Sequence, residues 1–300
     1  MGALAYEGRV ADVWTVRRML EWMADDFRGR GLDSPRLDAE LLVSDTLGVD
    51  RVRLYMDLDR PLVPDELTAI RGRVARRRAR EPVAYILGRR DFFGRTFHVA
   101  KGVLVPRPDS ETLVERALAL LEPDASTTVV DLCTGSGILG LTLLAERPHL
   151  HAILTDVDET ALAVARQNAE RLGVAARATF VHGDLFDAIP GEARFELIVT
   201  NPPYIASDVI DSLDEEVRLH EPRLALDGGA DGLRFIHRIL GAAPAFLSTG
   251  GVLLMETGED QEFSVRRMAQ EQNVWGTVEF HKDLGGRPRV AELHTLARAA

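Results

Sequence analysis

The chain has 300 residues, of which 46% are hydrophobic and 28% are charged, and its formal net charge at pH 7 is −11. This composition is typical of a soluble globular protein with about two domains. The excess of acidic residues argues against stable nucleic-acid binding, which needs a basic surface. The single cysteine, Cys133, excludes an intrachain disulfide and a zinc site built from cysteines, and it fits a reducing compartment.

No segment of the sequence predicts export or membrane insertion. Residues 1–10 include Glu7 and lack the apolar core of a signal peptide. The apolar runs elsewhere all fall short of the roughly 20 residues that cross a bilayer as a helix. We therefore expect a cytoplasmic protein that has no membrane partner.

The first part of the chain, residues 1–85, predicts a small bundle of helices. One expected helix has its apolar residues at the spacing of a single buried face, namely Val16, Met19, Leu20, Met23 and Phe27. Ser34 and Pro35 begin a second helix, which ends at Gly48, and Pro64 begins a third. The pattern therefore predicts a separate helical domain.

A run of arginines stands out within this bundle, at Arg71, Arg73, Arg76, Arg77, Arg78 and Arg80. A charge run of this kind is most often the solvated face of a helix. The alternative is a docking patch for an acidic protein or an RNA surface. The sequence favours the first interpretation and leaves the second open.

Residues 86–104 predict a β-hairpin that links the bundle to a catalytic domain, residues 105–300. The hairpin turn is expected at residues 92–95 and its second strand at residues 96–99. After the hairpin, two prolines hold Arg107 in an extended segment, and Ser110 is expected to cap the next helix. Arg107 either serves the site or pairs with Asp109, and the sequence leaves both possibilities open.

From Thr127 onward, short apolar strands alternate with helices, which is the pattern of an open parallel α/β sheet with helices on both faces. Roughly seven strands are expected, at residues 129–132, 152–154, 179–181, 195–199, 252–255, 278–280 and 290–293. Ligands of such sheets bind at the carboxyl ends of the strands. Candidate site residues are therefore those that directly follow a strand.

The first strand is followed by a glycine-rich turn of the form G-x-G-x-x-G, which lets a nucleotide ligand approach the backbone closely. The expected cofactor contacts in this turn are Cys133, Thr134, Gly135, Ser136 and Gly137. The glycines fit either a nicotinamide dinucleotide or S-adenosylmethionine. Asp131 favours the second, because a carboxylate near the turn repels a pyrophosphate and suits a ligand with ammonium and sulfonium groups.

Further acidic residues follow the next two strands. Asp156 is the preferred acceptor for the ribose hydroxyls, and Asp158 is the alternative in the following turn. Asp184 is expected to reach the adenine amino group, while Leu185 packs on the adenine ring.

The fourth strand runs directly into Asn201, Pro202, Pro203 and Tyr204. The prolines stop the strand and fix the geometry of the Asn201 side chain and backbone. Rigid acceptors at this edge suit a planar amide or amine, although Asn-Pro pairs also mark ordinary turns. If a substrate amide binds here, the Asn201 side-chain oxygen and the Pro202 carbonyl would accept its two hydrogens, and Tyr204 would wall the pocket. Asn201 is therefore expected at both the catalytic and the cofactor site.

These motifs in this order resemble class I S-adenosylmethionine-dependent methyltransferases. A closer resemblance, to the HemK/PrmC family, rests on residues 81–88, 104–111, 221–233 and 283–290 and covers nearly the whole chain. It implies a Rossmann-like, seven-stranded, mostly parallel sheet and methylation of the glutamine amide nitrogen in the Gly-Gly-Gln loop of peptide-chain release factors. It also implies that residues 133–137 and Asp156 hold the cofactor, that Leu185 lies near the adenine, and that residues 201–204 grip the glutamine. Two residues depart from the family pattern: Ser110 stands where Thr is usual, and Cys133, interpreted as a small packing residue, stands where Gly is frequent.

Several alternatives remain at this point. The same chemistry serves glutamine methyltransferases of ribosomal proteins, and an Asn-Pro-Pro-Tyr segment also serves adenine amino-methyltransferases of DNA or RNA, which the negative net charge disfavours. A nicotinamide dehydrogenase is supported by the glycines alone, and a non-catalytic cofactor-binding module leaves residues 201–204 without a purpose. No metal site is expected. The helical domain is expected to recognise the protein substrate.

Overall fold

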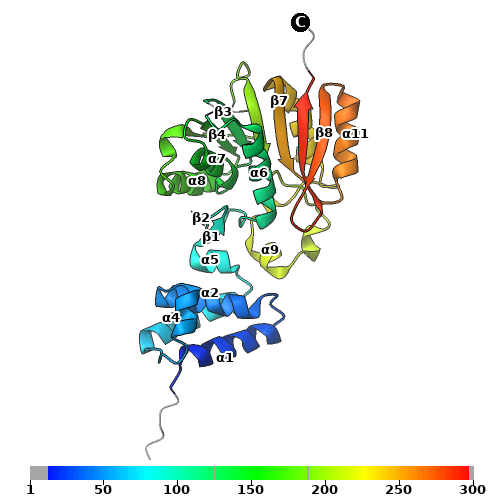
Figure 1. Ribbon diagram of the computed structural model, residues 1–300. Helices are drawn as coiled ribbons and strands as arrows, with labels where there is room; N and C mark the ends of the chain where they lie inside the picture. Colours follow the sequence, from blue (N-terminus) through cyan, green and yellow to red (C-terminus); the bar gives the residue numbers. More distant parts are fainter. Residues whose placement is uncertain (1–12, 125, 188, 297–300) are drawn as a thin grey trace, which may run out of the picture. The chain divides into compact units, whose positions relative to one another are not determined.

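The computed structural model describes residues 13–124, 126–187 and 189–296, and the chain divides into two compact units, Met1–Leu87 and Gly88–Ala300 (Figure 1). The expectation that residues 1–10 form no signal peptide falls outside the described residues. Within the described part of the chain, every helix is too short or too polar to cross a bilayer.

The first unit is the expected helical bundle, built from α1 (Val16–Gly29), α2 (Pro35–Leu47), α3 (Arg51–Met56), α4 (Pro64–Arg78) and α5 (Val83–Leu87). The Thr15 hydroxyl accepts the Arg18 N–H and caps α1, and Gly48 ends α2 in the left-handed conformation. Ser34 precedes α2 as expected, but its side chain makes no capping hydrogen bond. The start of α2 is favoured instead by Pro35, whose fixed φ suits the first position of a helix. The buried core of the bundle includes Leu20, Met23, Phe27, Leu42 and Ile70.

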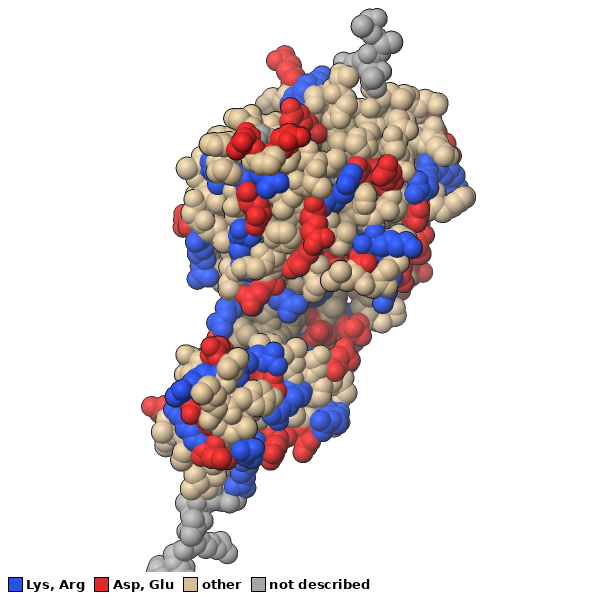
Figure 2. Space-filling model, in the orientation of Figure 1, with Lys and Arg blue, Asp and Glu red and all other residues tan. Residues whose placement is uncertain are grey.

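Most arginines of the run form ion pairs or hydrogen bonds within this bundle. Four of its members form ion pairs within the unit: Arg73 with Asp45, Arg76 with Glu81, Arg77 with Asp38, and Arg78 with Asp26. Arg80 donates to the Gly31 carbonyl at 3.1 Å. Figure 2 shows the result, a surface of this unit on which basic and acidic side chains are interspersed. Three of these ion pairs therefore join helices, while Arg71, Arg76 and Arg78 are also exposed, as the interpretation of a solvated face expects.

The hairpin belongs to the second unit. Strands β1 (Arg89–Phe92) and β2 (Arg95–His98) pair antiparallel, and both residues of the two-residue turn, Phe93 and Gly94, have positive φ. Asn168 fixes the hairpin to this unit, because its side chain accepts the His98 N–H at 2.7 Å and donates to the His98 carbonyl at 3.0 Å.

The second unit is built on a seven-stranded sheet whose order is β5-β4-β3-β6-β7-β9-β8. The strands are β3 (Thr128–Leu132), β4 (His151–Asp156), β5 (Ala178–His182), β6 (Phe195–Thr200), β7 (Leu247–Glu256), β8 (Trp275–Lys282) and β9 (Pro288–Thr295). Strands β3 to β7 are parallel to one another, and β9 pairs antiparallel with both β7 and β8. All seven predicted strands are confirmed, as is the Rossmann-like fold class.

Alternate residues of the central strands face two separate hydrophobic cores. Val129 and Val199 belong to the core under α6 (Glu111–Leu120), α7 (Ile138–Glu146) and α8 (Glu159–Arg171). Val130 and Ile198 belong to the core under α10 (Arg234–Ala242) and α11 (Glu262–Gln272). Burial on both faces explains why these strands read as continuous apolar runs. The short helix α9 (Glu215–His220) lies between β6 and β7 in sequence.

Candidate functional site

The sheet register places the candidate residues in one row. Leu132 on β3 is paired with Thr155 on β4 and with Thr200 on β6, and Thr200 is paired with Met255 on β7. The residues that follow these four are Cys133, Asp156, Asn201 and Glu256. Because the four strands are parallel, their carboxyl ends meet at the same edge, and motifs far apart in sequence form one site.

A cavity opens at this edge and collects most of the predicted cofactor residues. Those that line it are Cys133, Thr134, Gly135, Ser136, Asp156, Asp184, Leu185 and Asn201, together with Pro203 from the predicted catalytic set. Asp131, Gly137, Pro202 and Tyr204 lie outside its lining. All lining residues come from the second unit.

The glycine turn needs its glycines for two different reasons. Gly135 and Gly137 have φ of +56° and +84°, a conformation that side chains disfavour. Gly140 is required for packing, since a Cβ there would lie 3.0 Å from Oδ2 of Asp131 and 3.2 Å from Leu154. Cys133 adopts φ of +56° without being glycine, a conformation in which a side chain carries a steric cost.

Asp131 stabilises the glycine turn through hydrogen bonds. Its Oδ2 accepts the Thr134 hydroxyl at 2.6 Å and the Gly140 N–H at 2.9 Å, while Oδ1 has no hydrogen-bond partner among the described residues. The carboxyl group is fully buried, and this burial raises its pKa to about 7. Its position supports a role in shaping the turn, and a direct contact with the cofactor stays a prediction.

Asp156 lies in the cavity wall with its carboxylate held by backbone groups. Oδ2 accepts the Gly135 N–H at 2.8 Å and Oδ1 accepts the Asp158 N–H at 3.0 Å. Burial is the main cause that raises its pKa. Asp158 is engaged differently, because its Oδ1 accepts the Thr160 N–H at 2.8 Å and caps α8. Both residues line the cavity, and the role of Asp156 as the ribose acceptor stays a prediction.

The residues expected near the adenine follow β5. Both oxygens of Asp184 accept from the Arg238 guanidinium, at 3.1 and 2.9 Å. A carboxylate oxygen has two lone pairs, so this pair still leaves Asp184 able to accept from a ligand. Leu185 is buried, has φ of +54° and contributes its side chain to the cavity wall.

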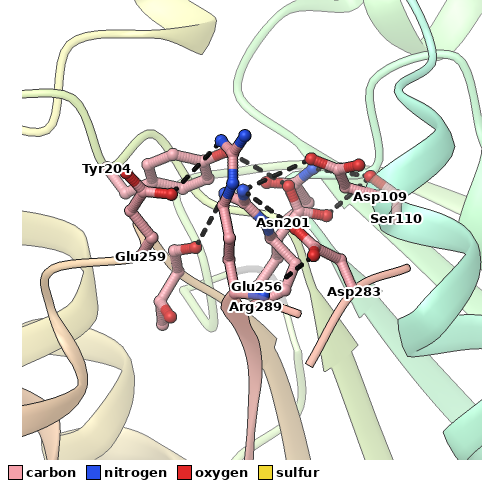
Figure 3. Close-up of polar contacts among 10 residues, drawn as sticks. Asp109, Ser110, Asn201, Tyr204, Glu256, Glu259, Asp283 and Arg289 are labelled. Carbon is pink, nitrogen blue, oxygen red and sulfur yellow. Dashed lines mark hydrogen bonds and ion pairs between the residues drawn. The ribbon is translucent and has the colours of Figure 1, made fainter. Parts of the chain in front are cut away.

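Asn201 is held by a chain of polar side chains, drawn in Figure 3. Its Nδ2 donates to Oγ of Ser110 at 3.3 Å, and the Ser110 hydroxyl donates to Oε2 of Glu256 at 2.6 Å. The Tyr204 hydroxyl donates to the other oxygen, Oε1 of Glu256, at 3.1 Å. Ser110 does occupy the N-cap position of α6, as expected, but its side chain makes no capping hydrogen bond. Its hydroxyl serves the site instead.

Sequence reasoning missed Glu256 and its surroundings. Glu256 is 1% exposed, and burial raises its pKa. Arg289, which is also buried, lies close to this carboxyl group and forms ion pairs at 3.3 Å with Asp109 and Asp283. One signal was available: like Asp131, Glu256 is a carboxylate at the end of an otherwise apolar strand.

A second cavity adjoins the first. The two share Leu104, Arg107, Asn201 and Ala225, and the second is further lined by Tyr204, Ile205, Leu213, Asp214, Glu216, Val217 and Leu226. Asn201 therefore stands in the wall of both cavities. Arg107 does not pair with Asp109, the partner considered from the sequence: its Nη2 lies 2.6 Å from Oε1 of Glu221, and Asp109 pairs with Arg289. Its place in the wall of both cavities leaves a role in the site as a prediction.

Two groups in the site are held in their neutral form by burial. Burial raises the pKa of the Cys133 thiol, which keeps it from acting as a thiolate nucleophile. It also raises the pKa of the Tyr204 hydroxyl, and the neighbouring Glu256 charge acts in the same direction. Tyr204 therefore remains a hydrogen-bond donor, and the interpretation of Cys133 as a packing residue fits its place beside the core under α10 and α11.

Comparison with known proteins gives consistent matches. Family models described as the PrmC N-terminal domain and the methyltransferase small domain match residues 18–88 and 109–217. The chain is 45% identical over 257 residues to a release factor glutamine methyltransferase of Geobacter sulfurreducens, covering 86% of this chain and 89% of the relative. It is 45% identical over 260 residues to one of Cereibacter sphaeroides, covering 87% and 91%. A T. thermophilus 16S rRNA methyltransferase, solved with S-adenosylmethionine and guanosine, shares the fold at 22% identity and a TM-score of 0.51, over 69% of this chain and 49% of that one.

Proposed function

Because this chain belongs to the family of release factor glutamine methyltransferases, we propose that it methylates the side-chain amide nitrogen of the glutamine in the Gly-Gly-Gln loop of peptide-chain release factors, using S-adenosylmethionine. The observation that carries the proposal is the position of Asn201. This residue lines both the cavity beside the glycine turn and the second cavity. The named relatives favour this substrate over a ribosomal protein or a nucleic acid.

The charge of the first cavity suits S-adenosylmethionine better than a dinucleotide. Three carboxylates, Asp156, Asp158 and Asp184, line it, and Asp131 lies buried behind the glycine turn. These groups attract a ligand with cationic centres and repel a pyrophosphate. Residues 133–137 and Asp156 would hold the cofactor, with Asp184 and Leu185 on the adenine side. When bound, the cofactor supplies an electrophilic methyl group on a sulfonium sulfur.

The protein's part in the reaction is orientation and charge stabilisation. An amide nitrogen is a poor nucleophile, because its lone pair is delocalised into the carbonyl group. The Asn201 side-chain oxygen and the Pro202 carbonyl accept the two amide hydrogens and fix the nitrogen at the junction of the cavities. The same acceptors stabilise the positive charge that develops on the nitrogen during attack. Pro203 and Tyr204 wall the site, and the Tyr204 ring lies against the amide plane.

The helical unit is assigned to recognition of the release factor. It has its own hydrophobic core, and none of residues 13–87 lines the cofactor cavity. We therefore propose that this unit binds the protein substrate and takes no part in the methyl transfer. A translation factor as substrate also places the enzyme in the cytoplasm, and the net charge of −11 gives no support for stable nucleic-acid binding.

The test is to incubate the enzyme with methyl-labelled S-adenosylmethionine and a purified release factor, and to map the label by peptide mass spectrometry. We expect one methyl group on the Gly-Gly-Gln glutamine. Asn201→Ala should lower the rate by about 10²-fold or more, in line with the loss of one preorganised group at the reacting centre. Asn273→Gly, which removes an asparagine from the end of α11 while suiting its positive φ, is the matched control. An unlabelled release factor, with label found on a ribosomal protein or nucleic acid, would refute the proposal.

A further inference from the structure

Three residues from distant parts of the sequence form a directed hydrogen-bond chain behind the substrate position. Glu256 is the last residue of β7, Asn201 follows the last residue of β6, and Ser110 stands at the start of α6. The pairing of Thr200 with Met255 brings Asn201 and Glu256 to the same level of the sheet. Figure 3 shows Ser110 between them.

The direction of each hydrogen bond follows from a count of the hydrogens. An ionised Glu256 can only accept, and each of its oxygens has a hydroxyl within reach: Ser110 at 2.6 Å and Tyr204 at 3.1 Å. Ser110 has a single hydroxyl hydrogen, and the bond to Glu256 uses it. Its oxygen can then only accept from Asn201.

The orientation of the Asn201 amide is thereby determined. Nδ2 must face Ser110, at 3.3 Å, and Oδ1 must face away from it, because Oδ1 against Ser110 would bring two acceptors together. Asn201 lines both cavities, so its free oxygen is available to a substrate. The two ends of an asparagine amide have almost the same size, and packing alone discriminates poorly between them.

We infer that Ser110 and Glu256 are positioning residues that orient the Asn201 amide with its oxygen toward the substrate. The inference rests on the proposed function in one respect, that the substrate presents an amide N–H to Asn201. Without the chain, Asn201 can turn its own NH₂ group toward the substrate NH₂ group, where two donors meet and the nitrogen is no longer fixed. The hydrogen bonds from Ser110 and Tyr204 and the charge of Arg289 oppose the effect of burial on the pKa of Glu256, and so favour the ionised, accepting form of this carboxylate.

The location of the Ser110 hydroxyl argues against a purely structural role. It makes no capping bond to α6, because Ser110 is the last residue of the short 3-10 helix Pro108–Ser110 and has helical backbone angles. The side chain is completely buried, and its two hydrogen-bond partners, Asn201 and Glu256, belong to the candidate site.

The experiment compares Ser110→Ala and Ser110→Thr in the full-length enzyme, with kcat and KM for the release factor and calorimetric Kd for S-adenosylmethionine. We expect Ser110→Ala to lower kcat about 10- to 100-fold, because it removes a hydrogen bond to a charged group. The Kd for the cofactor should change less than about twofold. Ser110→Thr should retain kcat within about threefold. Equal kcat in native enzyme and Ser110→Ala, or equal impairment of the Ala and Thr variants, would overturn the inference.

A matched control and a second variant separate positioning from folding. Thr295→Val removes a hydroxyl that donates to Ser248 at the opposite end of β7, and it should leave kcat unchanged. Glu256→Gln offers one acceptor oxygen to two hydroxyl donors, so it should also lower kcat. The inference can be judged apart from the proposed substrate by neutron diffraction. The Asn201 nitrogen should face Ser110 in the native enzyme, and an oxygen in that place would refute the inference even if release factors are methylated.

Discussion

Nη2 of Arg107 lies 2.6 Å from Oε1 of Glu221, although the two residues are 114 positions apart in the chain. Glu221 is buried, and its Oε2 also accepts the Val105 N–H at 3.1 Å. Since Arg107 lines both cavities, this ion pair fixes the segment that closes them on one side.

Removal of Arg107 should therefore be costly. Burial already raises the pKa of Glu221, and Arg107→Ala would leave this carboxylate without its compensating charge. We expect the free energy of unfolding to fall by about 1 to 3 kcal/mol, less than for a fully buried pair because the Arg107 side chain is 34% exposed. Urea denaturation measures the free energy of unfolding of Arg107→Ala, of Glu221→Gln and of the double variant. The double variant should recover part of the loss, and strict additivity would contradict the assignment.

Cofactor affinity should depend on pH through Asp156. Its pKa is raised in the folded protein, and only the ionised carboxylate offers all its lone pairs to the ribose hydroxyls. The affinity for S-adenosylmethionine should thus weaken as the pH falls through this raised pKa. Calorimetry across the pH range should show that Asp156→Asn binds about tenfold or more weakly at pH 7 and has a smaller pH dependence. The exposed Asp187→Asn is the control, and its pH profile should match the native one.

The backbone at Cys133 predicts an unusual order of stability between two small replacements. At φ of +56°, alanine carries the same steric cost as cysteine, whereas glycine carries none. Cys133→Gly should therefore be more stable than Cys133→Ala by about 1 kcal/mol, the reverse of their order in an ordinary strand or helix. Thermal unfolding of the two variants measures the difference. An alanine variant as stable as the glycine variant would show that the turn relaxes at this residue.

Glu292 should stabilise the fold at neutral pH and lose this contribution in acid. It is 1% exposed on β9, accepts from Arg116, and lies 2.7 Å from Nε2 of both His281 and His294. Its pKa is lowered from 4.5 to about 2, with the Arg116 hydrogen bond opposing the effect of burial. Stability from this carboxylate is present above pH 4.5 and disappears as the pH falls toward 2.

Glu292→Gln should accordingly lower the free energy of unfolding by about 1 to 3 kcal/mol at pH 7 and by much less near pH 2. Denaturant titrations at the two pH values give the comparison. The exposed neighbour Glu279→Gln should stay within about 0.5 kcal/mol of native at both. A loss that is the same at pH 7 and pH 2 would point to packing rather than charge.

The arginine run makes a prediction for the helical unit. Arg77 and Asp38 form an ion pair at 2.7 Å with both side chains buried, so Arg77→Leu removes a buried positive charge beside a buried carboxylate and should cost about 3 to 5 kcal/mol. Arg71→Leu, at an exposed position, should change stability by less than about 0.5 kcal/mol. Circular dichroism of thermal unfolding compares them. Similar losses in both variants would contradict the internal role assigned to the run.

The strands and the position of the cofactor turn were predictable from the sequence because both depend on local patterns. An apolar run bounded by turns marks a buried strand, and Asp156 and Asn201 could be singled out as polar residues that directly follow one. Parallel topology then brings such residues to one edge without any further information.

The partners of these residues were not predictable, because they depend on contacts between distant segments. Ser110 has the local signature of a helix cap, and its true partners, Glu256 and Asn201, become neighbours only in the folded sheet. The ion pairs of the arginine run and the pairing of Arg107 with Glu221 were missed for the same reason. Local pattern determines elements, whereas the choice among several oppositely charged partners is made by tertiary packing.

The alignment of Cys133, Asp156, Asn201 and Glu256 in one row also decides where the chain tolerates changes of length. The pairing of β6 with β7 contains one irregularity, between Phe195 and Leu197, and is regular from there to Thr200. An extra residue near the irregularity can be absorbed by enlarging the bulge. One inserted after Leu197 would shift Asn201 to the opposite face of the sheet and away from its partners. Insertions compatible with activity should thus accumulate at the beginnings of these strands and be excluded from their last three residues.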